Sequence, residues 1–572
     1  MKAWSLAAWG PVFLLAMSGC SASMGGDDDD SSPAAASGSS KNVGNGSSAP
    51  GTPNLSASGG SGNYLGGAAA GTTSMSTNPN APSDAAASGG AGAEEPTAEP
   101  IPVLPTNPFV ITAHDPLSTF AADVDTASYD IFTSSVNNGS LPPAATVRLE
   151  EFVNYFHYGY TPPASDATEP FSISLAAAPA PDPSTLLLRV GIQGRMPATK
   201  KRPANLVFLV DTSGSMAAEN KLPLVQYTLT EALTALDSTD KISIVSYAGS
   251  TSVRLEPTPV ADAATIEAAI AGLTTGGGTN GSSGIQLAYQ QAESAFIEGG
   301  INHVLLCTDG DFNLGVTSND ALVELITEKR KTGVTFTALG YGSNPNDAMM
   351  ERVSDAGNGT YSVIYSKGQA REYVENRLLS SLDFIAKDMK IQVEFNPAKV
   401  YAYRLLGYED RDIADSDFRN DVVDAGEVGA GHRVTALYQL VLAGGAIPNA
   451  SGAPAAQDGA AFSGQAEVAA EDYALVKVRY KAPDATEQDP AAEVNQSLPA
   501  DGIADSWSDL DPDFQWAYAV ATFAEILKKS PYSSTSSLQV IEQILKQPAN
   551  DTEAERVEFR TSFDKAKLLL AK

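Results

Sequence analysis

Residues 206–215 read Leu-Val-Phe-Leu-Val-Asp-Thr-Ser-Gly-Ser, an unbroken apolar run that ends in small polar side chains. An apolar run of this length predicts a strand buried on both faces, as in the middle of a parallel sheet. In open α/β sheets, ligands gather beyond the carboxyl ends of the strands. We therefore expect a ligand site around Asp211, Ser213 and Ser215.

A second apolar run, at 303–307, ends the same way, with Asp309 in a Cys-Thr-Asp-Gly segment. Between the two runs, a glycine loop at 276–280 precedes an expected helix and can carry Thr279 to the same rim. Three hydroxyls and two carboxylates are oxygen ligands of the kind that Mg²⁺ prefers, and they leave a coordination position open. The pattern predicts a metal site for Mg²⁺, with Mn²⁺ or Ca²⁺ as alternatives. Simple helix capping by the first segment is the competing interpretation.

Apolar strand-like runs alternate with amphipathic helical segments over residues 204–386. This alternation predicts an α/β domain with a doubly wound, mostly parallel, Rossmann-like sheet covered by helices on both faces. The expected strands are at 206–210, 242–247, 252–255, 303–307, 334–339 and 360–364. The expected helices are at 221–237, 262–271, 283–297, 319–331 and 369–386, with a short one before 360.

The flanking regions do not show this alternation of strand-like and helical segments. Residues 107–203 predict an α+β region with a helix at 127–137, and residues 387–510 predict a β-rich region. Residues 511–572 predict C-terminal helices. Because strand-rich segments lie on both sides, we expect the α/β domain to be inserted into a sandwich-like unit built from both flanks, with the C-terminal helices covering one face.

The N-terminus predicts an export signal over 1–20, since Lys2 precedes a short apolar run that ends at Cys20. The ending Met-Ser-Gly-Cys resembles a bacterial lipobox, which implies lipidation of Cys20, and Ser21 favours the outer membrane by the same resemblance. An ordinary secretory signal with a chance cysteine is the alternative. Residues 21–106 are rich in Ser, Gly and Ala and predict a disordered tether.

The Asp-x-Ser-x-Ser segment, with the distant Thr279 and Asp309, resembles the metal-ion-dependent adhesion site of von Willebrand factor type A domains. In that family, these positions hold the metal directly or through water. The flanking segments at 117–129, 148–156 and 403–438 are similar to those of a bacterial envelope family that carries a type A domain between them. The resemblance implies the architecture more than the role.

The net charge of −32 argues against nucleic-acid binding, because no basic patch is present to meet phosphates. Cys307 lies inside an apolar run and predicts a buried, inert thiol. No catalytic motif is found, so we expect no enzyme. Six aspartates between 410 and 424 lack the ligand order of a calcium loop and favour a solvated turn. Asp123 and Asp125 are expected to cap the helix at 127–137.

These observations predict a lipid-anchored cell-envelope protein that binds a protein or matrix partner through the metal. An acidic group of the partner would complete the coordination. The alternative is an envelope assembly or scaffold protein that acts through its flanking regions, with a structural or vestigial metal site. The sequence does not identify the partner.

Overall fold

The computed structural model describes residues 105–164, 166–181, 184–198, 201–310, 319–342, 345–486 and 489–572. The predicted signal sequence with Cys20, and almost all of the predicted tether, lie outside these residues. In the part of the chain that is described, no helix combines the length and apolarity needed to cross a membrane.

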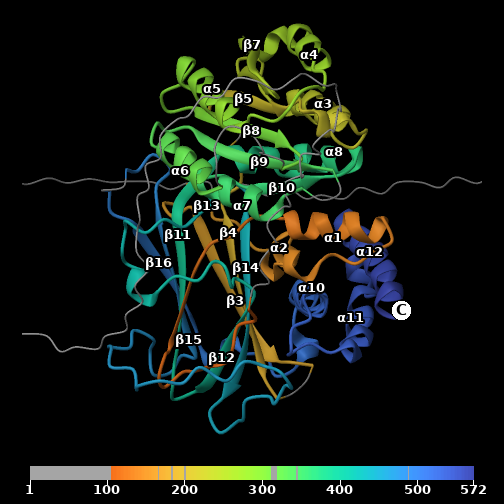
Figure 1. The fold of residues 1–572 in the computed structure, drawn as a ribbon. Helices are drawn as coiled ribbons and strands as arrows, with labels where there is room; N and C mark the ends of the chain where they lie inside the picture. The colour runs from red at the N-terminus through yellow and green to blue at the C-terminus, as the bar shows by residue number, and fades with distance from the viewer. Residues whose placement is uncertain are drawn as a thin grey trace, which may run out of the picture. The chain divides into compact units, whose positions relative to one another are not determined.

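The α/β domain is built on a six-stranded sheet (Figure 1). In their order across the sheet, the strands are β10 (Tyr361–Ile364), β9 (Thr335–Tyr341), β8 (Ile301–Thr308), β5 (Ala204–Asp211), β6 (Lys241–Tyr247) and β7 (Thr251–Pro259). Neighbours pair in parallel except for β6 and β7. From β5 the chain adds β6 and β7 on one side of the sheet. It then returns to β8, on the other side of β5, and continues outward to β9 and β10. This order confirms the predicted doubly wound sheet and places its switch point between β5 and β8.

Helices cover both faces of this sheet because the side chains of β5 alternate between two cores. Leu206 and Phe208 belong to one apolar cluster, and Val207 and Leu209 belong to the other. The helices of the first cluster are α3 (Leu222–Ala232), α4 (Ala263–Ala271), α8 (Lys367–Asn376) and α9 (Leu378–Leu382). Those of the second are α5 (Gly281–Ser294), α6 (Asn319–Arg330), α7 (Asp347–Ala356) and α1 (Ala127–Asn137).

The predicted helix at 369–386 is wrong at its C-terminal end. Helix α8 ends before Arg377, α9 follows, and strand β11 begins at Phe384. Phe384 and Ala386 are buried, and the segment pairs with β13. Sheet pairing therefore overrides the helical spacing of the apolar residues over the last turn.

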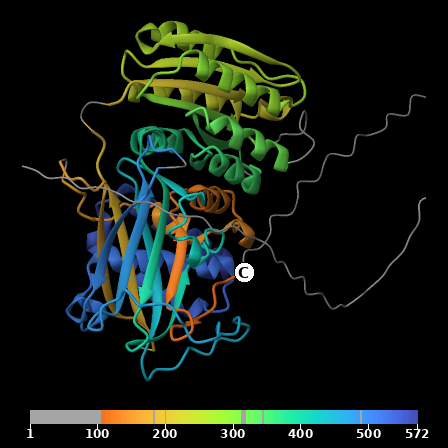
Figure 2. The same cartoon turned by 90° about the vertical axis from the view of Figure 1, so that its left-hand side faces the viewer.

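Both flanks contribute to a two-sheet sandwich. One sheet has the order β1 (Val110–Ile111), β12 (Val400–Leu406), β14 (Arg433–Leu442), β4 (Leu186–Gly194) and β3 (Phe171–Pro179). The other has the order β13 (Gly426–Gly429), β11 (Phe384–Phe395), β15 (Ala474–Lys481) and β16 (Ala492–Leu498). Strand β2 (Leu117–Ala121), orange in Figure 2, pairs with β11. Side chains of both sheets, such as Val190 and Val476, share one core. The predicted insertion into a sandwich is confirmed.

The C-terminal helices pack with helices of the N-terminal flank. They are α10 (Pro512–Lys528), α11 (Leu538–Leu545) and α12 (Ala554–Leu570), and they meet α1 and α2 (Leu149–Asn154). Phe559 of α12 lies among the rings of Tyr129, Phe132 and Phe523. The same cluster includes Leu437 of β14, so these helices cover the outer face of the first sheet.

Two arginines of the flanking regions, Arg148 before α2 and Arg411 after β12, bind the α/β domain through the acidic face of α7. Arg148 donates to Asp347 at 2.9 Å, and Arg411 donates to Asp355 at 2.8 Å. Arg411 also pairs with Asp123 and Asp125, at 3.4 Å each. The prediction that these two aspartates cap α1 is wrong, because the buried guanidinium of Arg411 needs carboxylate partners.

Candidate metal centre

Asp211 is the last residue of β5, which lies at the centre of the sheet between β8 and β6. Its side chain is fully buried. One carboxylate oxygen accepts the backbone N–H of Ser213 at 2.8 Å, and the other accepts the hydroxyl of Thr308 at 2.8 Å. The carboxylate is therefore held at the switch point of the sheet, where ligands bind in folds of this kind.

Ser213 and Ser215 follow on the turn that leaves the strand. Ser213 is buried, whereas Ser215 is exposed at the rim. Their hydroxyl oxygens lie 3.0 Å apart. With metal–oxygen distances of roughly 2.1 Å, neighbouring ligands of an octahedral Mg²⁺ are separated by about 3.0 Å. The two hydroxyls are hydrogen-bonded to each other at this distance, which is also compatible with two adjacent ligands of such an ion.

Backbone hydrogen bonds connect the loop that carries Thr279 to the turn that carries the two serines. Gly276 donates to the carbonyl of Thr212 at 2.8 Å, and Gly214 donates to the carbonyl of Gly277 at 3.2 Å. Gly277 has a φ of +85°, a backbone conformation that residues other than glycine rarely adopt. Thr279 itself is buried. The glycine run therefore allows the two loops to approach closely.

Asp309 follows β8, the parallel neighbour of β5, and its carboxylate is largely buried. Lys221 donates from its ammonium group to Asp309 at 2.8 Å and to the carbonyl of Ser215 at 3.1 Å. The lysine therefore bridges the serine turn and the second carboxylate. Lys221 was not among the predicted site residues, because no sequence motif points to it.

The charge environment favours a cation between these loops. Burial raises the pKa of Asp211 to about 6, and the nearby charge of Asp309 adds to this shift. Tyr247 lies close enough for both carboxylates to contribute to raising its pKa, after burial as the main cause. A buried carboxylate that resists ionisation is stabilised in its charged form by a nearby metal ion.

The donor set fits a hard divalent cation. Hydroxyl and carboxylate oxygens, the ligands that such an ion prefers, lie beyond the ends of β5 and β8. Asp211, Ser213, Ser215, Thr279 and Asp309 are the residues that would hold the ion. Thr308 positions Asp211 by donating its hydroxyl to the carboxylate, and it was not predicted as a site residue. Its position in the sequence, next to Asp309, could have indicated this role.

Other candidates from the sequence lie outside this centre. Cys307 is fully buried, as predicted, and burial raises the pKa of its thiol to about 12, which disfavours the reactive thiolate. The aspartates between 410 and 424 do not form a single solvated turn. Asp410 pairs with Arg148, Asp421 with Arg479 and Asp424 with Arg330, because each faces a different neighbouring element.

Comparison with protein families gives three matches along the chain. The model described as von Willebrand factor type A domain matches residues 205–376. A model described as von Willebrand factor matches residues 99–189. The model described as Uncharacterized protein YfbK, C-terminal, matches residues 380–569.

The chain is similar to the Uncharacterized protein YfbK of Escherichia coli (strain K12). The two are 38% identical over 467 residues, which cover 79% of this chain and 78% of the relative. Among solved structures, a von Willebrand factor type A protein from Catenulispora acidiphila is 13% identical, with a TM-score of 0.40 over 71% of this chain and 97% of that one. The ArnB paralog VWA2 from Sulfolobus acidocaldarius is 16% identical, with a TM-score of 0.34 over 70% and 98%.

Proposed function

The chain belongs to the family of the YfbK protein and contains a von Willebrand factor type A domain, and we propose that this domain binds a protein or matrix partner through a divalent metal ion. The ion would be Mg²⁺, held by Asp211, Ser213, Ser215, Thr279 and Asp309. An acidic group of the partner would complete its coordination. The proposal includes no catalytic step.

The two buried carboxylates beyond the ends of β5 and β8, Asp211 and Asp309, together with the serine hydroxyls of the adjoining turn, are the observation that carries this proposal. Hydroxyl ligands bring no negative charge, and the two carboxylates are partly engaged with Thr308 and Lys221. A divalent ion in such a site remains short of negative charge, so a carboxylate from outside is a favourable last ligand. Ser215 is exposed, which gives a partner access to the rim.

Partner binding is tested with the full chain bound to a support and incubated with an envelope extract. The incubation is run with Mg²⁺, with EDTA and with the Asp211→Asn variant. We expect a partner that is retained only by the wild-type chain in Mg²⁺ and is released by a high concentration of free glutamate. A partner retained equally in all three arms would exclude the metal mechanism and support a scaffold role for the flanking regions.

We also infer that the protein is anchored to the cell envelope, in the outer membrane, through a lipid on Cys20. The support is the apolar run that ends in Met-Ser-Gly-Cys and the Ser/Gly/Ala-rich segment after it. Mass spectrometry of the mature N-terminus should find a diacylglyceryl group on Cys20. The Cys20→Ala variant should lose it and leave the membrane fraction, whereas an unmodified N-terminus at another residue would exclude the anchor.

A further inference from the structure

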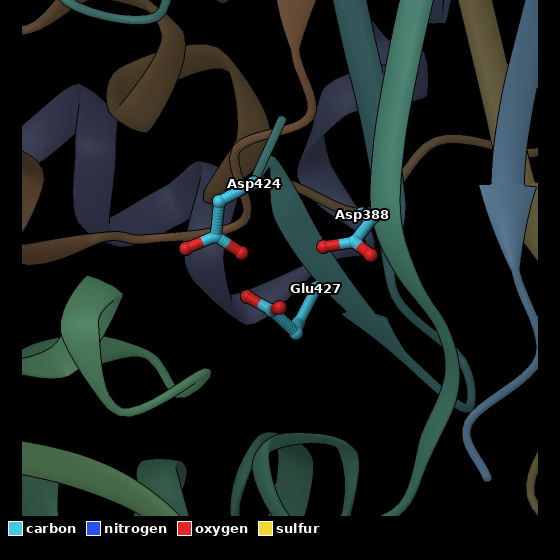
Figure 3. A group of neighbouring side chains, drawn as sticks. All are labelled: Asp388, Asp424 and Glu427. Atoms are coloured by element: carbon cyan, nitrogen blue, oxygen red, sulfur yellow. The ribbon is translucent and has the colours of Figure 1, made fainter. Parts of the chain in front are cut away.

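Three carboxylates meet at the edge of the sandwich, and none of them belongs to the candidate centre at β5 and β8. They belong to Asp388 of β11, Asp424 in the loop before β13, and Glu427 of β13 (Figure 3). One oxygen from each lies within 4.8 Å of the others. Figure 3 shows the three carboxylates directed toward a common space.

A β-bulge produces this meeting. Ala386 pairs with Val428 and Met389 pairs with Gly426, so two residues of β11 lie opposite the single residue Glu427. Asp388 is one of these two and has a φ of +53°. Bulges redirect side chains in this way and are frequent at functional sites.

Glu427 gives an independent reason to look for a ligand. Its side chain is only 7% exposed, yet its oxygen Oε1 has no hydrogen-bond partner among the described residues. A buried carboxylate oxygen without a donor is unfavourable unless a cation or a water meets it. Since Figure 3 shows the carboxylate aimed at Asp424 and Asp388, the missing partner belongs in the space between them.

The neighbouring cations do not balance the three carboxylates. Arg330 pairs with Asp424 at 2.6 Å and also donates to Asn358. Lys481 pairs with Asp388 at 3.2 Å and also donates to the carbonyl of Asp421. Both positive groups are therefore shared with other acceptors.

We propose that Asp388, Asp424 and Glu427 bind a divalent cation, Ca²⁺. Calcium takes oxygen ligands at roughly 2.3–2.6 Å, so ligands on opposite sides of the ion are about 4.6–5.2 Å apart. Any two ligand oxygens of one such ion are therefore at most about 5.2 Å apart, and the three carboxylates meet this condition because one oxygen of each lies within 4.8 Å of the others. The ion would supply the partner that Oε1 of Glu427 lacks. Ca²⁺ also tolerates irregular geometry and mixed water ligands better than Mg²⁺ does.

A cavity gives the ion access. It has a volume of about 420 Å³ and is lined by Asp424 and Glu427 of the sandwich and by Asp355 and Arg352 of the α/β domain. Asp424 is half exposed. Arg330, which pairs with Asp424, ends helix α6 of the α/β domain. The ion would therefore bind close to the junction of the two parts and would compete with Arg330 for Asp424.

The site is tested by equilibrium dialysis of the full chain with Ca²⁺ in the Asp211→Asn background, which removes the candidate centre at β5. We expect one Ca²⁺ per chain. Glu427→Gln and Asp424→Asn should each weaken the affinity by tenfold or more, because each removes a negative ligand and keeps the shape. Asp412→Asn, which changes an exposed aspartate of the same cavity, should leave the affinity unchanged. Arg330→Gln should increase the affinity several-fold.

Circular dichroism in EDTA controls for folding. Should Glu427→Gln fail to fold, Asp424→Asn decides the matter, since that side chain is half exposed. No Ca²⁺ bound in the Asp211→Asn background would overturn the proposal. So would binding that survives both substitutions, or that falls equally in Asp412→Asn.

Discussion

The ammonium group of Lys221 lies 2.8 Å from a carboxylate oxygen of Asp309, beside the predicted metal centre. The side chain of Lys221 is 25% exposed, and that of Asp309 is 7% exposed. A positive charge at this position neutralises Asp309 in the protein without metal. It also opposes the approach of a divalent cation.

Replacing Lys221 by Gln should therefore strengthen Mg²⁺ binding. Removal of one positive charge near the ion is worth about 1 kcal/mol at a partly exposed site, which corresponds to roughly a fivefold tighter affinity. Calorimetric titration of the full chain with Mg²⁺ measures the change. Lys329→Gln is the matched control, because Lys329 is 28% exposed and pairs with Glu293 on another helix. A weaker affinity in Lys221→Gln would show that the lysine supports the site.

Arg148 should be essential for the junction between the sandwich and the α/β domain. Its side chain is 5% exposed and pairs with Asp347, Glu351, Glu151 and Asp410. Arg148→Met should lower the free energy of unfolding by roughly 3–5 kcal/mol, because it leaves buried carboxylates without their partner. Urea unfolding followed by circular dichroism measures the loss. Arg352→Met, at an ion pair whose side chains are 47% and 84% exposed, should change it by less than about 1 kcal/mol. Equal losses of unfolding free energy in Arg148→Met and Arg352→Met would contradict the role of Arg148 at this junction.

Phe559 should anchor the C-terminal helices to the N-terminal flank. Its ring is fully buried among aromatic side chains of α1, α10 and α12 and the ring of Phe156. Phe559→Ala should lower the free energy of unfolding by roughly 3–5 kcal/mol through the cavity that it leaves. Val557→Ala, on the same helix but 41% exposed, should stay within about 0.5 kcal/mol of the wild type. Thermal and urea unfolding of both variants check this difference.

His303 should make the protein less stable in mild acid. It is fully buried on β8, and burial lowers its pKa to about 3. The unfolded chain takes up a proton below about pH 6.5, whereas the folded chain does not until about pH 3. The contribution of His303 to stability is therefore complete above pH 6.5 and is lost progressively as the pH falls from 6.5 toward 3.

The loss due to His303 between pH 7 and pH 5.5 is about 1 kcal/mol. His303→Gln should remove this part of the pH dependence, so the free energy of unfolding should fall less between the two values than in the wild type. Urea unfolding of the wild type and of His303→Gln at pH 7 and pH 5.5 measures this difference in the free energy of unfolding. If the free energy of unfolding falls equally in both proteins, folding does not lower the pKa of His303, and the imidazole is charged in the folded protein at pH 5.5.

Much of the α/β domain follows from sequence because its strands are long apolar runs. Strands β5 and β8 extend the predicted runs by a few residues, and in the N-terminal flank helix α1 agrees with its predicted bounds. The short or polar strands were missed. Strand β16 is largely exposed, and β13 has only four residues, so neither carries an alternating apolar pattern. Their pairing with β15 and β11 comes from tertiary contacts that local sequence does not encode.

The candidate metal centre was predictable because its residues follow two strands and a glycine loop. Lys221 was not, since nothing in its neighbourhood distinguishes it from a surface lysine. The cluster of Asp388, Asp424 and Glu427 depends on a β-bulge that joins residues 36 to 39 positions apart along the chain. Asp123 and Asp125 were misassigned as helix caps because their partner, Arg411, is distant in sequence.

Mg²⁺ binding by the full chain is the most direct test of the central claim. Calorimetric titration should show saturable binding in the wild type and in Glu427→Gln, and should lose it in Asp211→Asn while the circular dichroism spectrum stays unchanged. Equal Mg²⁺ binding in the wild type and Asp211→Asn, or no binding in the folded wild type, would contradict a metal centre at the ends of β5 and β8.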